Sequence, residues 1–139
     1  MKSFSWIITT LARFVLAGFM LSAGVGHFRS TDSFLAQVPP FLPNPELIVY
    51  VSGVIEISLA LGLVLLNKYR VQVGWALAGF YVLIFPGNIS QFLTETSAFG
   101  LDTNTDRAVR LIFQPILIVW ALWCTGAWND YRSKRLLTK

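Results

Sequence analysis

Four long apolar segments constrain the fold of this chain more than any other feature of its sequence. They cover residues 6–26, 47–66, 71–92 and 109–128, to within a few positions. A helix needs about 20 mostly apolar residues to cross the hydrocarbon core of a bilayer. Only 13% of the 139 residues are charged, against about 25% in soluble domains. The sequence therefore predicts an all-α membrane protein, a four-transmembrane-helix antiparallel bundle that forms one domain over residues 1–139.

The distribution of lysine and arginine predicts how these helices are oriented. Short cytoplasmic segments of membrane proteins are enriched in both residues. With four spans, the two tails and the loop between the second and third spans share one side, and their basic residues are Lys2, Lys68, Arg70, Arg132, Lys134, Arg135 and Lys139. The two loops on the other side hold Arg29 and Arg107. We therefore expect both termini to be cytoplasmic, with the net charge of +4 directed at lipid headgroups and not at nucleic acid.

One acidic residue, Glu56, lies inside the second apolar segment, VYVSGVIEISLALGLVLL (49–66). An ionisable side chain at membrane depth costs at least about 2.5–3.5 kcal/mol unless it is paired or hydrated. Helix geometry places Arg13 of the first segment about 10 Å inside the cytoplasmic surface, within reach of Glu56. We predict an ion pair between Arg13 and Glu56, either as a structural contact or as the floor of a pocket. The alternative is that Arg13 extends to the cytoplasmic interface.

Each apolar segment also has one face on which polar and small residues alternate. These faces comprise Arg13, Ala17, Met20, Gly24 and His27; Gly53, Glu56 and Ala60; Gly74, Ala78, Tyr81, Phe85 and Asn88; and Arg110, Gln114, Leu117, Ala121 and Cys124. Small residues let membrane helices approach closely, and polar residues form hydrogen bonds across the interface. The pattern predicts a bundle with a partly polar interior.

Most of these polar residues fall in the outer half of the bundle when positions are counted along the helices. We predict a ligand pocket there, open toward the outer side and lined by Glu56, Asn88, Arg110, Gln114, Tyr81 and His27. A purely structural role for the polar groups is the alternative. His27 lies at a helix end, so a capping or interfacial role is a further alternative for that residue.

Several other sequence features indicate neither a disulfide nor a metal, haem or calcium site. The single cysteine, Cys124, excludes an intramolecular disulfide, and one histidine with one cysteine provides no metal or haem motif. The stretch DTNTD (102–106) begins like a calcium loop, but Arg107 stands where that loop requires glycine. Thr105 and Asp106 are instead predicted to cap the fourth helix.

The first outer loop, FLAQVPPFLPNPE (34–46), is rich in proline and in large apolar side chains. Its four prolines exclude a helix across positions 39–45. We expect this loop to fold over the mouth of the bundle or to lie in the membrane interface, with the second helix starting after Pro45. It would act either as a stiff connector or as a lid over the pocket.

Five motifs, in this order, resemble the DoxX/DoxD-like family of small bacterial membrane proteins: GVGHF (24–28), VPPFLP (38–43), SGVIEISLALGL (52–63), FPGNI (85–89) and RLIFQPILIVWAL (110–122). The resemblance covers nearly the whole chain. Gly87 departs from the family pattern, which more often has alanine before the asparagine. The resemblance implies four membrane spans in the bacterial cytoplasmic (inner) membrane. It also implies a link to quinones, phenols or oxidative stress, because the family is named after a subunit of a thiosulfate:quinone oxidoreductase.

Two functions are compatible with these features. In the first, the pocket binds a small quinone-like or phenolic molecule, and the protein would be a subunit of a membrane oxidoreductase or of a stress-response system. Its oxygens and ring would meet Arg110, Gln114, Asn88, Glu56, Tyr81 and Phe85. Electrons would then come from a redox partner protein, since no haem, flavin or metal motif is present in the sequence. In the second, the protein is a non-enzymatic assembly factor or chaperone, as animal relatives of the family are. Neither catalytic turnover of a substrate nor homo-oligomer formation follows from the sequence.

Overall fold

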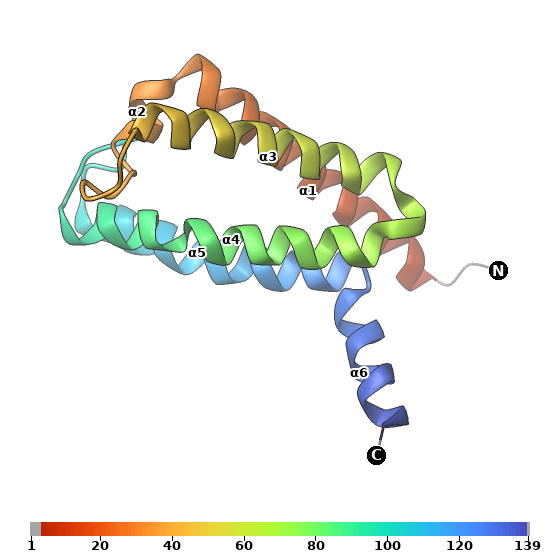
Figure 1. The fold of residues 1–139 in the computed structure, drawn as a ribbon. Coiled ribbons are helices and arrows are strands. Elements are labelled where there is room, and N and C mark those ends of the chain that lie inside the picture. Colours follow the sequence, from red (N-terminus) through yellow and green to blue (C-terminus); the bar gives the residue numbers. More distant parts are fainter. Residues whose placement is uncertain (1–3, 139) are drawn as a thin grey trace.

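The fold is a helical bundle (Figure 1), seen in a computed structural model that describes residues 4–138. In chain order the helices are α1 (Phe4–Arg29), α2 (Thr31–Leu35), α3 (Pro45–Leu65), the short 3-10 helix η1 (Asn67–Tyr69), α4 (Arg70–Leu93), α5 (Asn104–Cys124) and α6 (Ala127–Leu137). Four segments, namely α1, α3, η1 with α4, and α5, are long and apolar enough to cross a membrane. This confirms the all-α fold with four candidate spans. Lys2 and Lys139, which contributed to the predicted orientation, lie outside the described residues.

The four long helices form two pairs, α1 with α3 and α4 with α5 (Figure 1). One end of the bundle carries α2 and the loop of residues 94–103, and we call it the α2 end. The other end carries η1 and the start of α6, which turns away from the bundle, and we call it the α6 end. The apolar core lies toward the α6 end, where Leu16, Leu63, Leu77 and Ala121 are almost fully buried. The remaining half of the bundle holds most of the buried polar residues.

The boundaries of α5 differ from the prediction at both ends. Thr103 and Asp106 form a capping box, in which each side chain bonds the backbone N–H of the other residue, so the helix begins at Asn104 and the cap is not Thr105. At the other end Gly126 adopts a φ of 76°, a conformation that commonly ends helices. The fourth helix therefore stops at Cys124 and not near Trp128. The chain continues as α6, which the sequence analysis did not predict.

The proline-rich loop behaves as predicted at its C-terminal boundary. Residues 36–44 contain no helix, and α3 begins at Pro45 in its first turn, where a missing N–H leaves no hydrogen bond unmade. The short helix α2, which precedes this loop, was not predicted. It places Phe34 next to Gly26 of α1.

The closest approach between α1 and α3 occurs at a pair of glycines. A Cβ atom added to Gly53 would lie 2.8 Å from the Cβ of His27 and 3.0 Å from the carbonyl oxygen of Gly24. A Cβ atom added to Gly24 would lie 3.0 Å from the carbonyl oxygen of Gly53. The two backbones are therefore in direct contact, as small residues allow in membrane helices.

Gly53→Ala tests whether this contact holds the first helix pair. The added methyl group meets backbone and the base of a side chain, neither of which can rotate away, so we expect a loss of about 1–3 kcal/mol of unfolding free energy. Gly79→Ala is the matched control, because nothing lies within 4 Å of a Cβ at this helical position. Unfolding in detergent micelles measures both variants. Equal stability of the two would contradict the close crossing of α1 and α3.

Candidate functional site

A cavity of about 750 Å³ lies in the half of the bundle near the α2 end. It is lined by all six residues that the sequence analysis assigned to a ligand pocket, and they come from all four long helices: His27, Glu56, Tyr81, Asn88, Arg110 and Gln114. The structure thus brings together side chains that are far apart in the sequence. The volume of the cavity falls within the range of about 300–1,000 Å³ that is typical of small-molecule sites.

The rest of the cavity wall is mostly apolar. Aromatic rings contribute from three helices through Phe19, Phe80 and Phe113, and from α2 through Phe34. The loop after α2 contributes Gln37, Val38, Pro39 and Leu42. Phe85, which we expected to pack on a ligand ring, is not among the lining residues. The sequence analysis did not assign Phe34 to the site, because α2 itself carries too short a pattern to be predicted.

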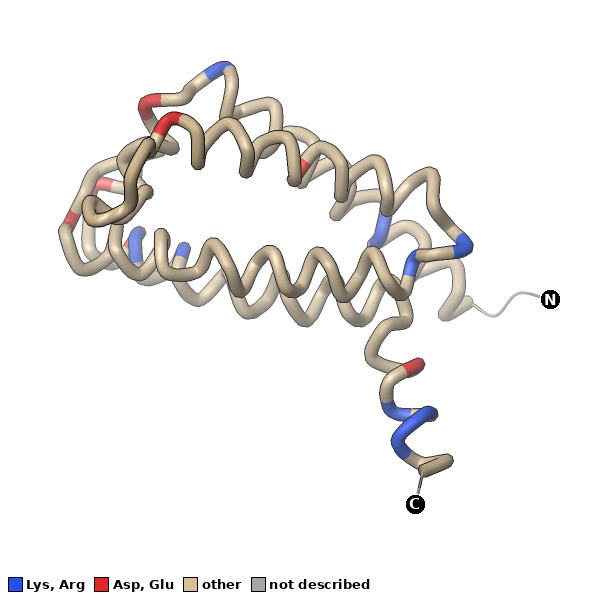
Figure 2. The backbone as a smooth tube through the Cα atoms, viewed as in Figure 1, with Lys and Arg blue, Asp and Glu red and all other residues tan. Residues whose placement is uncertain are grey.

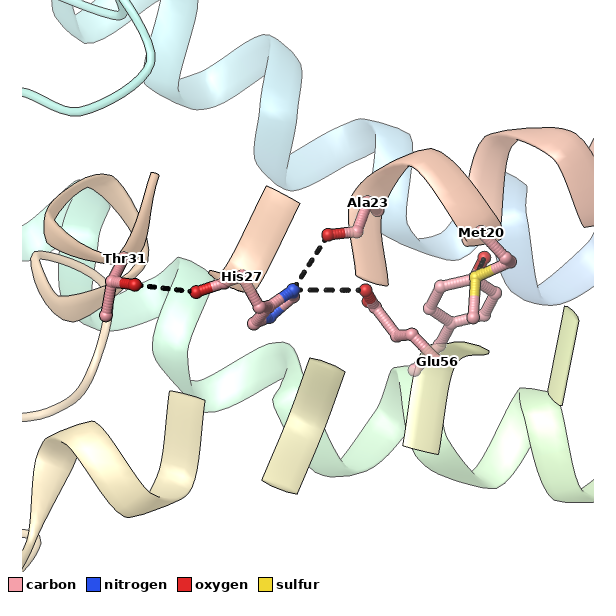
Figure 3. A network of polar contacts seen from close by, with 6 residues as sticks. Met20, Ala23, His27, Thr31 and Glu56 are labelled. Carbon is pink, nitrogen blue, oxygen red and sulfur yellow. Dashed lines mark hydrogen bonds and ion pairs between the residues drawn. The ribbon is translucent and has the colours of Figure 1, made fainter. Parts of the chain in front are cut away.

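Glu56 lies against His27 inside this cavity (Figure 3). His27 Nδ1 is 2.9 Å from the carbonyl oxygen of Ala23 and 3.3 Å from Glu56 Oε2. Because a carbonyl oxygen can only accept, Nδ1 carries a hydrogen, and the carboxylate lies at the side of that N–H. Glu56 is only 5% exposed, yet among the described residues its buried Oε2 has no hydrogen-bond partner. A buried carboxylate oxygen in this state has unused capacity to accept a hydrogen bond.

The predicted ion pair between Arg13 and Glu56 is wrong. Arg13 is buried, but its Nη1 donates to Asn67 Oδ1 at 2.8 Å, at the α6 end of the bundle. Positions 56 and 67 are about 16 Å apart along a helical path, which places Glu56 out of reach. Arg13 does not line the cavity. Among the described residues, the ionisable partner of Glu56 is His27, which carries a charge only when it is protonated.

Arg110, Asn88 and Gln114 form a chain of hydrogen bonds across α4 and α5. Arg110 Nε donates to Asn88 Oδ1 at 3.3 Å, and Asn88 Nδ2 donates to Gln114 Oε1 at 2.5 Å. Gln114 Nε2 then donates to the backbone carbonyl of Tyr81 at 2.7 Å. Most of the capacity of the two amides is used within the protein. Arg110 is different, because no described residue accepts from its terminal guanidinium nitrogens.

A series of aromatic contacts at the α2 end of the cavity runs from His27 to Arg110. The ring of Phe34 stacks on His27, with centroids 3.7 Å apart, and meets Phe99 edge-on at 4.8 Å. The guanidinium carbon of Arg110 lies 4.6 Å from the centroid of Phe99, a cation–π geometry. These contacts orient the His27 ring through Phe34, which also lines the cavity, and the Arg110 side chain through Phe99, which does not.

In a comparison with known protein families, a family described as a domain of unknown function (DUF8561) matches residues 16–125. The chain belongs to the DUF8561 family. The matched range contains every residue of the cavity wall but neither Arg13 nor α6. No curated protein and no solved structure matches the chain.

Few other reactive or metal-binding groups occur in residues 4–138. Within that range there is no group of three or more His, Cys, Asp and Glu side chains placed to hold a metal ion. Cys124 is buried and its thiol is free. Tyr81 contributes its ring to the cavity wall, while its hydroxyl donates to the sulfur of Met20 at 2.7 Å.

Double-mutant cycles in detergent distinguish the observed partner of Arg13 from the predicted one. We expect Arg13→Met and Asn67→Ala to couple by about 0.6–1.7 kcal/mol, the range found for side-chain hydrogen bonds in membrane proteins. Arg13→Met and Glu56→Gln should add to within about 0.5 kcal/mol, because the two sites are distant. Strong coupling in the second cycle with none in the first would contradict the observed contacts.

Proposed function

We propose that this chain is a membrane protein, an antiparallel bundle of four transmembrane helices, that binds a small quinone-like or phenolic molecule in the cavity. The observation that carries the proposal is the pairing of two unused polar groups in one mostly apolar cavity. Glu56 offers a buried oxygen that accepts no hydrogen bond from a described residue, and Arg110 offers terminal nitrogens that donate none. Buried polar groups without partners are rare in proteins, and Glu56 Oε2 is one of them, whereas Arg110 is half-buried.

The two groups have complementary chemistry. A carboxylate accepts a hydrogen bond from a phenolic or quinol hydroxyl, whereas a guanidinium donates to a carbonyl or phenolate oxygen. Arg110 and Glu56 are close enough to interact electrostatically, but no ion pair forms between them within the described residues. A ring with oxygens on opposite sides is the ligand type that would use both groups, since both line the same cavity. The aromatic walls, including Tyr81 and Phe113, would pack on its faces.

Asn88 and Gln114 take a different part from the one predicted. Each amide has already used its oxygen and one N–H within the hydrogen-bond chain. In the proposal they hold Arg110 in place, and at most one N–H of each faces a ligand. Arg110 and Glu56 therefore carry recognition of the ligand oxygens.

The resemblance to the DoxX/DoxD-like family supports the same proposal, because members of that family are linked to quinone and phenol chemistry. We infer that a redox step, where one occurs, takes electrons from a partner protein. The assembly-factor alternative requires polar groups that meet client helices. The groups described above point into the cavity, which favours a ligand.

The charge distribution supports an orientation with both termini in the cytoplasm of a bacterial inner membrane. Figure 2 shows the basic residues around η1 and in α6 at the α6 end, and most acidic residues at the α2 end. By the positive-inside rule the α6 end would be cytoplasmic. The cavity would then lie in the outer half of the membrane.

Ligand binding is tested with purified protein in lipid nanodiscs and three probes: a short-chain benzoquinone, its quinol and a simple phenol. We expect Glu56→Gln and Arg110→Gln each to weaken binding about 10- to 100-fold, which corresponds to one charge-assisted hydrogen bond. Glu46→Gln and Arg29→Gln are matched controls, because both residues are exposed and neither lines the cavity. Absence of binding for all probes, with no aromatic compound in solvent extracts of the protein, would favour the assembly-factor alternative.

Orientation is tested with a reporter enzyme that is active only outside the cytoplasm. Fused after Lys139 it should be inactive, and inserted near Thr103 it should be active. The reverse pattern would place the cavity in the inner half of the membrane. Two fusion points on opposite sides control for expression of each fusion.

A further inference from the structure

The cavity is covered on most of its sides. On the side of α1 and α5, the rings of Phe19 and Phe113 meet edge-on with centroids 6.0 Å apart. At the α2 end, Phe34 and Pro39 lie over it, and toward the α6 end the apolar core fills the bundle. These contacts leave the side between α3 and α4, the two helices that face the viewer in Figure 1.

On that side, residues of the cavity wall are also exposed on the outer surface. Leu47, Val51 and Ile55 recur every fourth residue on α3, and all three line the cavity. Their exposed fractions fall from 59% to 48% to 36% toward Glu56. On α4, Leu83 lines the cavity and is 73% exposed. Phe19 and Phe113 also line the cavity and are 43% and 40% exposed, but their edge-on ring contact closes that side. On α3 and α4 the exposed wall residues make no such ring contact, so they mark an opening, which we call the α3–α4 gap.

The residues of the α3–α4 gap are all apolar, and they belong to helices long enough to span a membrane. The gap therefore faces lipid hydrocarbon and not water. A water-filled route would instead need polar side chains along its edge, because lipid-exposed polar groups are costly. The stripe from Leu47 to Ile55 extends for about 12 Å along α3, enough to contact a chain of several methylene groups.

The route through the α2 end is held shut by specific contacts. Gln37 Nε2 donates to Gln91 Oε1 at 2.9 Å, which ties the loop after α2 to α4. The carbonyl oxygen of Gln37 lies so close to Gly87 that a Cβ there would be 3.0 Å away. Pro39, in the same loop, is also buried. Passage from the water at this end would require these contacts to break.

We propose that the ligand enters from the bilayer through the α3–α4 gap and carries an apolar tail that stays there. Its oxygen-bearing ring would lie between Glu56 and Arg110. This inference rests on the proposed function and narrows its ligand class to membrane-dissolved ring compounds with a hydrocarbon tail. Water-soluble phenols would then be weaker ligands of the same site.

The test compares two benzoquinone probes, one without a tail and one with a ten-carbon tail, in nanodiscs of one lipid composition. Leu83→Trp and Val51→Trp place a large ring in the α3–α4 gap. Val82→Trp and Val54→Trp are matched controls, because Val82 and Val54 are 60% and 56% exposed on the same helices but do not line the cavity. Partitioning of each probe into the membrane is the same for all variants, so it cancels between them.

We expect both gap variants to weaken equilibrium binding of the tailed probe at least about 10-fold, the equivalent of about two methylene groups no longer buried. Binding of the tailless probe should change less than about 2-fold at equilibrium, with a slower association rate. The controls should match the unmodified protein for both probes.

Three results would overturn the inference. Gap variants that bind the tailed probe like their controls would show that the tail lies elsewhere. Faster association in a Gln91→Ala variant, with no effect of the gap variants, would point to the α2 end. In both cases the proposed function would stand as long as Glu56→Gln still weakens binding. If neither probe binds the unmodified protein and only phospholipid is extracted, the proposed function fails together with the inference.

Discussion

The carboxylate of Glu56 at membrane depth is the constraint on which the rest of the structure depends. Its partner His27 is positioned by the glycine contact between α1 and α3. Gly24 precedes His27 by three residues, and Gly53 precedes Glu56 by three, so each polar side chain lies about one helical turn from the point where the backbones touch. The N–H of His27 bonds the carbonyl oxygen of Ala23. The imidazole therefore lies beside Glu56 but leaves its buried Oε2 without a hydrogen-bond partner among the described residues.

The bundle divides its two halves between stability and recognition. Toward the α6 end, Leu16, Leu63 and Leu77 fill the interior and hold the helix pairs together. Toward the α2 end, the pairs separate around the cavity, and aromatic contacts take over as supports. Phe19 with Phe113 connects α1 to α5, and Phe34 with Phe99 connects α2 to the loop before α5.

Much of this arrangement follows from periodicity in the sequence, because a helix turns each residue to a predictable side. The stripes containing Glu56, Asn88 and Gln114 faced the interior as expected, and the first three spans lay within three residues of their predicted ends, whereas the fourth was displaced toward the N-terminus. Periodicity does not fix how far one helix slides along another. The Arg13–Glu56 pair was predicted from depth alone, whereas the contact of Gly24 with Gly53 sets the register and carries Arg13 to Asn67. The helix α2 and its ring contacts could not be predicted from the sequence for another reason, because five residues are too few to show a helical periodicity.

The two amides near the cavity have a structural reason of their own. Helices α4 and α5 each contain one proline at this level, Pro86 and Pro115, and a proline cannot donate to the carbonyl four residues before it. In a bilayer no water replaces the missing bond, so neighbouring side chains have to support the backbone. Pro86 frees the carbonyl of Val82, and Gln114, beside Pro115, bonds the neighbouring carbonyl of Tyr81. Asn88 then connects Gln114 to Arg110. Amides committed in this way to two interrupted helices are poorly free to follow a ligand. Recognition of polar atoms in the cavity is thereby concentrated on the two groups with capacity left, a carboxylate on α3 and a guanidinium on α5.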